Sequence, residues 1–258
     1  NESLLAKKIK KSKRIKHILS DQVDFSEDEF CFNFLPEKIR RTYGLVETTN
    51  VSAHDYDKFA LELINSSPNG LYLDCGCGKR NEYLDNVVNF EIVNYDTTDV
   101  LGIGENLPFQ DESFDGVLSL NVLEHVKDPF QCAKEISRVL KKDGKLYCVV
   151  PFMSPYHDFP DHYYNMTQSG LKNLFCNYLE VTKQDVISSG LPIFSITWIL
   201  NNWINGLENL KTKKDFMEMK VKDLINPPVE YLNEPFVKEL SQEKNFELGA
   251  TTALWAKK

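Results

Sequence analysis

The segment from residue 71 to residue 96, LYLDCGCGKRNEYLDNVVNFEIVNYD, constrains the fold more than any other part of the chain. A short apolar run ends in Asp74, two glycines stand at positions 76 and 78, and a second apolar run leads to Asp96. Glycine lacks a Cβ, so the backbone can turn sharply after the first run and approach a ligand closely. An acid at the end of the next strand, about 20 residues further on, can accept hydrogen bonds from both hydroxyls of a ribose. This order of parts predicts a nucleoside-containing ligand at the edge of a parallel sheet.

Short apolar runs alternate with helix-forming segments along the chain. Strands are expected at residues 71–74, 90–95, 100–103, 115–121, 145–150, 179–187 and 247–256. Helices are expected at residues 54–66, 128–140 and 167–176. This alternation indicates an α/β fold with a doubly wound, mostly parallel seven-stranded sheet. Because only about a dozen residues separate Gly78 from the second strand, the first crossover helix must be short or replaced by a loop.

Two parts of the chain do not fit this alternation. Residues 1–50 are expected to form an N-terminal helical and irregular extension to a main domain at residues 51–258. Within that domain, residues 188–245 are expected to form a helical insertion before the last strand. Its apolar stretch LPIFSITWILNNWINGL is interrupted by the pair Asn201 and Asn202 and is shorter than the roughly 20 residues that span a bilayer. The insertion is then either a core helix with a surface loop or a lid over the active site.

Net charge and cysteine spacing argue against two classes of site. The formal net charge is −8, whereas a nucleic-acid substrate requires a basic face. The six cysteines are scattered, and the C-x-C at residues 75–77 is not followed by a second pair of ligands. We therefore expect no metal site and no nucleic-acid partner. Cysteines within apolar runs are typical of reduced thiols in a cytoplasmic protein.

The first 16 residues are the exception to the acidic charge. Their cations, interleaved with apolar residues, are Lys7, Lys8, Lys10, Lys11, Lys13, Arg14 and Lys16. One interpretation is a solvated helix with a partly apolar face. The other is a patch that binds an anionic membrane surface or an acidic partner. A cytoplasmic location with peripheral membrane contact through the N-terminus is therefore one hypothesis.

The glycine pair narrows the choice of nucleoside ligand. A dinucleotide site requires G-x-G-x-x-G, but Asn81 stands at the third glycine position and a Walker lysine is missing as well. Asp74, directly before the turn, would repel a phosphate but attract a sulfonium or an α-amino group. These features favour S-adenosyl-L-methionine over NAD or ATP.

Four motifs in order resemble one known family. They are LDCGCG at residues 73–78, Asp96, ENLPFQDESFDGVLSLNVLEHVKDP at residues 105–129 and EISRVLKKDGKLYCVVP at residues 135–151. Together they resemble the class I S-adenosylmethionine-dependent methyltransferases and, within these, the methyltransferase type 11 group. The resemblance covers residues 71–176 and resumes weakly at the expected C-terminal strand. It implies a Rossmann-like methyltransferase fold, enzymatic methyl transfer and S-adenosyl-L-methionine as the cofactor.

The resemblance also implies roles for particular residues. Asp74, Gly76 and Gly78 would line the methionine end of the cofactor, and Asp96 would hold the ribose. The other implied cofactor-binding residues are Glu105, Asn106 and Leu107 near the adenine, and Asn121 and Leu123 beside the reactive methyl. The family commonly has an acid at the position of Ile103, so here the adenine would depend on other groups.

The segment after the fifth expected strand, PFMSPYHDFPDHYYNMT at residues 151–167, is where we expect groups that bind or activate the acceptor. Histidine titrates near neutral pH, so His157 and His162, together with Tyr163, are the candidate catalytic residues. The alternative is a polar loop with aromatic anchors. A looser resemblance of this loop to relatives associated with cell-surface glycan assembly favours O-methylation of a small molecule or of a sugar or glycan precursor.

Two other functions compete with this hypothesis. A lipid-like or aromatic acceptor would be held by Phe194, Trp198 and Trp203 of the insertion. Alternatively, the chain is a methyltransferase fold used as a non-catalytic binding or assembly subunit, which Ile103 and the shortened glycine loop would suit. Failure to bind S-adenosylmethionine would favour this last reading.

Overall fold

The computed structural model describes residues 3–20, 26–28, 31–45, 52, 55–157 and 161–257. The chain divides into two compact units, each built from two segments. The first unit comprises residues 1–151 and 159–184, and the second comprises residues 152–158 and 185–258. Apart from His157, the predicted site residues lie in the first unit.

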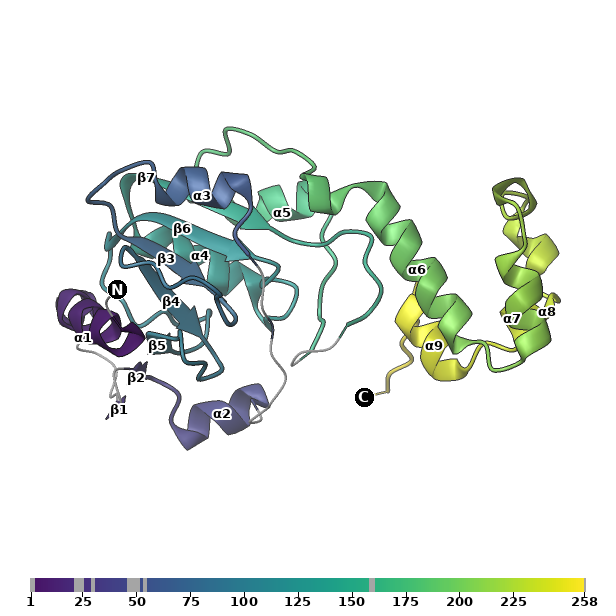
Figure 1. Ribbon diagram of the computed structural model, residues 1–258, viewed down its shortest axis with the longest axis horizontal. Helices are drawn as coiled ribbons and strands as arrows, with labels where there is room; N and C mark the ends of the chain where they lie inside the picture. The colour runs from purple at the N-terminus through teal and green to yellow at the C-terminus, as the bar shows by residue number, and fades with distance from the viewer. Residues whose placement is uncertain are drawn as a thin grey trace. The chain divides into compact units, whose positions relative to one another are not determined.

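A seven-stranded sheet forms the centre of the first unit (Figure 1). Its strands are β1 (Ser26–Asp28), β2 (Cys31–Asn33), β3 (Tyr72–Cys75), β4 (Val87–Glu91), β5 (Val100–Leu101), β6 (Phe114–Leu120) and β7 (Leu140–Val149). They lie in the order β1-β2-β5-β4-β3-β6-β7. Six of these strands are parallel, and β1 pairs antiparallel with β2 at the edge. The predicted doubly wound, mostly parallel α/β sheet is confirmed.

Two of the predicted strands are wrong. Residues 179–187 are irregular, and residues 247–256 overlap the end of helix α9 (Gln242–Leu248) and an irregular segment. Ser241 begins α9 because its side chain accepts a hydrogen bond from the Lys244 amide at 3.1 Å, and the following Gln, Glu, Lys and Leu favour a helix. Residues 179–187 alternate in polarity but pair with no strand, and an unpaired strand is not stable by itself. The sheet is instead extended by β1 and β2 from the N-terminal segment.

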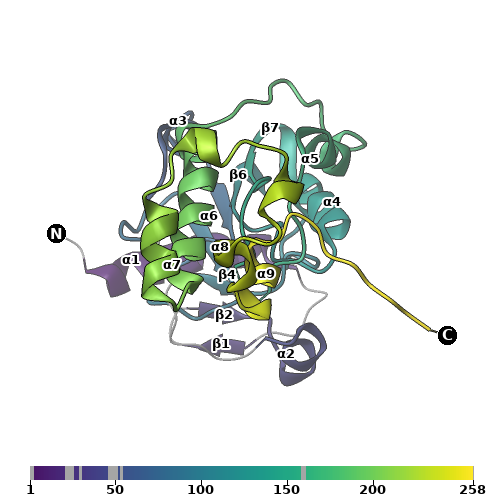
Figure 2. The same cartoon turned by 90° about the vertical axis from the view of Figure 1, so that its right-hand side faces the viewer.

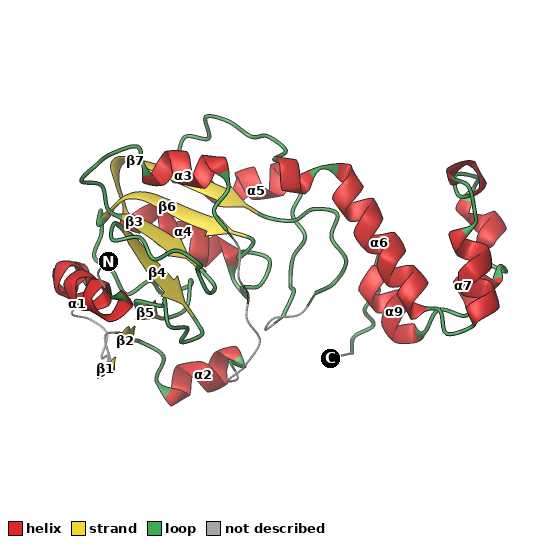
Figure 3. Ribbon diagram, in the orientation of Figure 1, coloured by secondary structure: helices red, strands yellow, loops and turns green. Residues whose placement is uncertain are grey.

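Helices cover both faces of the sheet (Figure 3). Helix α3 (Lys58–Ile64) packs on one face, and α4 (Pro129–Val139) and α5 (Gln168–Phe175) pack on the other. Side chains of β3 alternate between the two cores: Tyr72 packs with Ile64 of α3, and Leu73 packs in the core that contains Ile136 of α4. Burial on both faces is the expected state of parallel strands. The three predicted helices of this unit are confirmed.

The connections after β3 and β4 contain no helix. Residues 76–86 and 92–99 are loops, which confirms the expected loss of the first crossover helix. Helix α1 (Leu4–Ile15), followed by η1 (Lys16–Ile18), comes from the N-terminus and packs here through Ile15, which is fully buried in the main core. Helix α2 (Glu37–Tyr43) follows β2 and ends at Gly44, which adopts a φ of +67°.

The second unit is helical, as predicted for residues 188–245. Its elements are η2 (Ser188–Gly190), α6 (Pro192–Gly206), α7 (Leu210–Met217), η3 (Val221–Asp223), η4 (Pro228–Tyr231), α8 (Pro235–Lys238) and α9. A small apolar core holds them together, in which Phe216 stacks on Phe236 with ring centroids 4.7 Å apart. Helix α9 lies beside α6 (Figure 2), and Gly206 permits this approach because a Cβ there would lie 2.8 Å from Cγ of Lys244. Within the described residues, every helix is too short or too polar to cross a membrane.

Candidate functional site

The predicted glycine turn lies at the carboxyl end of β3. Gly76 and Gly78 adopt φ values of +80° and +59°, a region that L side chains rarely enter. A Cβ on Gly76 would lie 2.5 Å from Cγ2 of Val122, and one on Gly78 would lie 2.5 Å from the carbonyl oxygen of Ser52. Glycine is therefore required at both positions, and the turn is packed against the loop that follows β6.

Asp74, the acid before the turn, is fully buried. Its Oδ2 accepts hydrogen bonds from the Tyr56 hydroxyl at 2.6 Å and from Nε of Arg80 at 2.8 Å. The Arg80 guanidinium also lies over the Tyr56 ring, 4.2 Å from its centroid. The other oxygen, Oδ1, has no hydrogen-bond partner among the described residues. The charge of Asp74 is thus balanced by the chain itself, and one oxygen is left for an additional donor.

The second strand of the motif ends earlier than predicted. β4 ends at Glu91, whereas the strand was expected to end at Asp96. Residues 93–98 form a turn instead, in which the Tyr95 amide donates to the Val93 carbonyl at 3.0 Å. Asn, Asp and Thr, which crowd this segment, favour turns because their side chains bond to nearby backbone groups. The predicted strand end at Asp96 is therefore wrong, and the assignment of Asp96 to the ribose stays a prediction.

Glu91 closes the glycine turn. Its Oε2 accepts a hydrogen bond from the Gly78 amide at 2.7 Å, and its Oε1 accepts one from the Ile92 amide at 2.8 Å. Burial raises the pKa of the Glu91 carboxyl above its ordinary value. Each oxygen keeps a second lone pair, so the carboxyl group can accept further donors at the end of β4.

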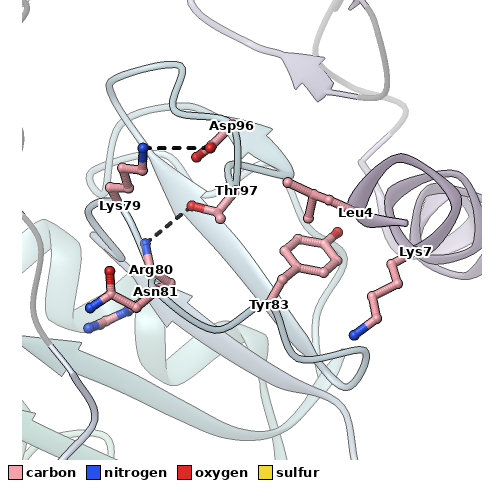
Figure 4. Close-up of a pocket in the computed structure, with 8 residues that line it drawn as sticks. All are labelled: Leu4, Lys7, Lys79, Arg80, Asn81, Tyr83, Asp96 and Thr97. Atoms are coloured by element: carbon pink, nitrogen blue, oxygen red, sulfur yellow. Dashed lines mark hydrogen bonds and ion pairs between the residues drawn. The ribbon is translucent and has the colours of Figure 1, made fainter. Parts of the chain in front are cut away.

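Asp96 lies in a hollow between the glycine turn and α1 (Figure 4). The hollow has a volume of about 340 Å³. It is lined by Leu4, Lys7, Lys79, Arg80, Asn81, Tyr83, Asp96 and Thr97. The Asp96 side chain is 56% exposed, with Oδ2 3.6 Å from Nζ of Lys79. The Arg80 amide donates to Oγ1 of Thr97 at 3.2 Å, which ties the glycine turn to the loop that carries Asp96.

The segment expected at the adenine is largely committed to internal contacts. The Glu105 carboxylate accepts from the Lys127 amide at 3.2 Å, before the start of α4. Leu107 is buried, and its amide donates to Oε2 of Glu135 at 3.0 Å. Asn106 is exposed between them. Of the three predicted residues, Asn106 is therefore the one with a side chain open to a ligand.

The two predicted residues after β6 have unequal surroundings. Asn121 is exposed and adopts a φ of +55°, which Asn tolerates better than most residues with a Cβ. Leu123 is buried in the main core. Non-glycine residues with a positive φ, such as Asn121, are concentrated at functional sites, so this loop is a candidate for contact with a substrate.

Glu124, which the sequence analysis did not single out, is fully buried in this loop. Neither of its carboxyl oxygens has a hydrogen-bond partner among the described residues. Nε2 of His125 lies 3.8 Å from Oε1, which is too far for a hydrogen bond. Burial raises the pKa of Glu124 to about 8. At neutral pH the group is therefore mainly an uncharged acid.

Residues 161–166 cross over the loop that follows β6. The amides of Tyr163 and Tyr164 both donate to the Glu124 carbonyl, at 2.7 and 3.2 Å. Nδ1 of His125 lies 2.6 Å from the carbonyl oxygen of Asp161. Because a carbonyl only accepts, Nδ1 carries a proton, and Nε2 is the nitrogen that faces Glu124.

Two of the predicted catalytic residues, His162 and Tyr163, belong to this crossing segment. The ring centroid of His162 lies 5.8 Å from that of His125, and its Nε2 lies 3.0 Å from Oδ1 of Asn165. The exposed Tyr163 hydroxyl donates to Oδ2 of Asp161 at 2.9 Å. The structure thus brings two histidines and an exposed phenol together beside the end of β6.

His157, the third predicted catalytic residue, belongs to the second unit. Its Nδ1 lies 3.0 Å from the carbonyl oxygen of Pro155, and its ring centroid lies 5.4 Å from that of Trp198. Residues 158–160 of the same loop lie outside the described residues. A catalytic role for His157 stays a prediction.

Sequence reasoning missed Glu91 and Glu124 for different reasons. The spacing of about 20 residues from the glycines pointed to Asp96, although the apolar run VVNFE at residues 87–91 already ended in an acid. That run was the signal that identifies Glu91. Glu124 stands between an apolar residue and a histidine near a strand end, but the burial of a side chain and its hydrogen bonding have no signature in sequence.

Part of the chain is similar in sequence to known proteins. Residues 73–148 match a family model described as a methyltransferase domain. An uncharacterised protein of Methanocaldococcus jannaschii is 38% identical over 91 residues, which cover 31% of this chain and 40% of that protein. The uncharacterised methyltransferase YcgJ of Bacillus subtilis is 28% identical over 110 residues, which cover 38% of this chain and 43% of that protein. The YcgJ crystal structure is 18% identical, with a TM-score of 0.38, over 56% of this chain and 82% of that chain.

The chain spans less than half the length of these two curated relatives. The segment that matches the family model begins in β3 and ends in β7, and it contains the glycine turn and the loop after β6. The predicted family is confirmed, and with it the predicted cofactor of that family, S-adenosyl-L-methionine. Residues 73–148 are thus a methyltransferase domain of the class I, type 11 group, as the four motifs predicted.

Proposed function

We propose that the chain transfers a methyl group from S-adenosylmethionine to a hydroxyl group of a small molecule or of a sugar or glycan precursor. The cofactor supplies an activated methyl on a sulfonium, so the chain must align the acceptor, exclude water and take up the hydroxyl proton. The observation that carries the proposal is the glycine turn after β3, closed by the Glu91 carboxylate at the end of β4.

The residues around the turn suit the cofactor. Gly76 and Gly78 let the backbone approach the methionine end without a side chain in between. Oδ1 of Asp74, which has no hydrogen-bond partner among the residues the structure describes, can accept a hydrogen bond from the α-amino group. We assign the two ribose hydroxyls to Glu91 in place of Asp96, because a carboxylate at a strand end can accept both of them.

The acceptor side is built from the loop after β6 and residues 161–166. His162 and Tyr163 are the exposed or half-buried groups that would orient the acceptor hydroxyl. His125 is fixed by the Asp161 carbonyl, and the neighbouring Glu124 carboxyl has no hydrogen-bond partner among the described residues. A proton leaving the acceptor would pass to one of these histidines, since imidazole titrates nearest to neutral pH.

A lipid-like or aromatic acceptor is the second candidate. Phe194 and Trp198 of α6 are 54% and 41% exposed, which suits an apolar ligand. Trp203, the third residue of that hypothesis, instead donates from Nε1 to the Phe236 carbonyl at 2.7 Å and packs in the core of the second unit. The apolar-acceptor reading therefore rests on two side chains, not three.

The first experiment is calorimetric titration of S-adenosylhomocysteine into the protein, with NAD and ATP as controls. Glu91→Gln is compared with Glu62→Gln, which removes one exposed charge from α3. We expect selective binding by the wild-type protein and an affinity at least about tenfold lower in Glu91→Gln, because a hydrogen bond to a charged group contributes roughly 1.5–3 kcal/mol. Glu62→Gln should bind as the wild type does.

Each outcome has a distinct meaning. If the wild-type protein does not bind S-adenosylhomocysteine, the proposed reaction is wrong and the non-catalytic subunit becomes the leading hypothesis. If it binds but Glu91→Gln binds equally well, the ribose assignment is wrong while the cofactor stands. Selective binding would be followed by transfer of labelled methyl to a panel of nucleotide sugars, free sugars, phenols and lipid alcohols.

A further inference from the structure

Helix α1 occupies the place that a crossover helix would fill. The loops at residues 76–86 and 92–99 connect parallel strands without any helix of their own. Parallel strands normally need a connection of a dozen or more residues, usually helical, to cover the sheet face. Here a segment from the N-terminus, Leu4–Ile15, lies against both loops. The face beside the glycine turn is therefore covered by residues far from it in sequence.

Two lysines of α1 are buried against these loops. Lys8 is 8% exposed, and its Nζ donates to the carbonyl oxygens of Asp96 at 3.0 Å and Thr98 at 2.8 Å. Lys11 is 2% exposed, and its Nζ donates to Oδ2 of Asp99 at 3.0 Å. Burying an ammonium group is unfavourable unless it is paired and hydrogen-bonded, so these contacts commit both side chains to the fold.

The loop that Lys8 holds is tied in turn to the glycine turn. Oγ1 of Thr97 accepts from the Arg80 amide at 3.2 Å, and the Thr97 carbonyl accepts from Nδ2 of Asn89 at 2.8 Å. Nε of Arg80 donates to Asp74 at 2.8 Å. Lys8 therefore holds the backbone on both sides of Thr97, and hydrogen bonds connect Thr97 through Arg80 to Asp74, the acid that precedes Gly76.

Figure 4 shows the hollow between α1 and the glycine turn, with the hydrogen bond from Arg80 to Thr97. Leu4 and Lys7 of α1 form one wall, and the glycine-turn residues Lys79 and Arg80 face them, with Thr97 beside Arg80. The loop at residues 92–99 begins directly after Glu91. A displacement of this loop would therefore shift both the glycine turn and the carboxylate assigned to the ribose.

We propose that Lys8 is a positioning residue for cofactor binding, which makes α1 part of the cofactor site. The inference rests on the proposed function, because it assigns the 92–99 loop to the cofactor. Two cations of the basic N-terminus, Lys8 and Lys11, then bind other parts of the chain and not a membrane. A helix whose Lys8 and Lys11 are engaged in this way cannot offer them to an anionic surface at the same time.

The test compares three variants of the full chain by calorimetric titration with S-adenosylhomocysteine and by thermal unfolding. Lys8→Met removes the donors but keeps the apolar stem, Lys8→Arg keeps donors, and Lys10→Met removes an exposed cation from the same helix. We expect the dissociation constant to rise about tenfold in Lys8→Met, to recover in part in Lys8→Arg and to stay within about twofold in Lys10→Met. The effect on affinity should remain at temperatures where all the variants are fully folded.

A second variant tests the same set of hydrogen bonds without changing α1. Thr97→Val removes the acceptor of the Arg80 amide and should also weaken binding, so it decides the question if Lys8→Met fails to fold. Folded Lys8→Met and Thr97→Val variants with wild-type affinity would overturn the inference while leaving the cofactor in place. A wild-type protein that does not bind S-adenosylhomocysteine would instead remove the proposed function on which the inference rests.

Discussion

Two regions of the first unit treat their buried acids in opposite ways. The region proposed for the cofactor, here called the cofactor region, is formed by β3, β4, β5 and the loops at 76–86 and 92–99, and in it Asp74 is paired with Arg80 and Asp99 with Lys11. The region proposed for the acceptor, here called the acceptor region, is formed by residues 121–128 and 161–166, and in it Glu124 is buried without a hydrogen-bond partner among the described residues. The same kind of side chain is thus paired and fixed in one region, whereas in the other it is largely uncharged and has no hydrogen-bond partner among the described residues.

The difference has a physical consequence for binding. A buried acid that is paired and hydrogen-bonded holds its neighbours in one geometry, which suits a ligand that is always the same. A buried polar group without a partner costs roughly 1–3 kcal/mol, and such groups call for an explanation such as a ligand or a proton-transfer role. The comparison fits a division in which the cofactor region is preorganised and the acceptor region awaits a substrate.

The largest expected effect is a loss of stability when the buried ion pair of the cofactor region is broken. Nζ of Lys11 bonds to Asp99 and to the Val87 carbonyl, and it lies 3.5 Å from the centroid of the Tyr83 ring. Lys11→Met would leave Asp99 buried without its cation. We expect the free energy of unfolding to fall by about 3–5 kcal/mol, measured by urea denaturation at neutral pH.

Two further variants sharpen this result. Lys13→Met changes an exposed cation of the same helix and should alter the free energy of unfolding by less than about 0.5 kcal/mol. Lys11→Met combined with Asp99→Asn should recover part of the loss, because the uncompensated charge is gone. Equal stability of Lys11→Met and Lys13→Met would show that the cofactor region does not depend on its buried ion pair.

The second prediction concerns Glu124 and the pH. Its pKa is raised from 4.5 to about 8, so the folded protein holds a proton that the unfolded chain has already lost in this interval. The contribution of Glu124 to the free energy of unfolding is greatest below about pH 4.5. It declines as the pH rises towards 8, by up to roughly 1.4 kcal/mol per pH unit. Glu124→Gln removes the titration. The variant should therefore gain stability relative to the wild type as the pH rises from 5 to 8.

Denaturation of both proteins at several pH values measures this difference. The control is Glu112→Gln, which changes an exposed acid. Glu135→Gln would not serve, because Glu135 forms an ion pair with Arg138. Parallel pH profiles of the free energy of unfolding for Glu124→Gln and the wild type would mean that the Glu124 carboxyl has a hydrogen-bond partner in solution. The contrast between the two regions would then disappear.

A smaller effect is expected from the backbone of the acceptor region. Asn121 adopts a φ of +55° and its side chain is exposed. Asn121→Ala should lower the free energy of unfolding by about 1 kcal/mol, because alanine tolerates this conformation less well than asparagine. Asn121→Gly should be neutral or slightly stabilising. Equal loss in the two variants would point to a side-chain contact and not to backbone strain.

The fold could be predicted from sequence where local pattern and tertiary structure agree. The apolar runs before Gly76 and around Val117 are buried on both faces in the structure, and their spacing alone indicates parallel strands. Strand pairing at the edges could not be predicted in the same way. β1 and β2 are only three residues long, and they form because Phe32 pairs with Val100, a contact between distant parts of the chain.

The candidate site divides similarly. The glycines were predictable because a positive φ and close packing both require them, and the acid before them was predictable from its place in the motif. The pairing of Asp74 with Arg80 and the docking of Lys8 and Lys11 were not, because a sequence rich in lysine reads as solvated or membrane-binding whether or not two of its side chains are buried.

The smallest expected effect is at Asp96, and it tests where the cofactor region ends. Asp96 is more than half exposed, and its 3.6 Å contact with Lys79 is screened by water, so pairs of this kind contribute about 0–1 kcal/mol. Asp96→Ala should change the affinity for S-adenosylhomocysteine by less than about twofold, while Glu91→Gln lowers it at least about tenfold. Calorimetry on the two variants under one buffer condition makes the comparison direct. If Asp96→Ala lowers the affinity as much as Glu91→Gln does, Asp96 is the residue that binds the ribose. The cofactor would then extend into the hollow beside α1.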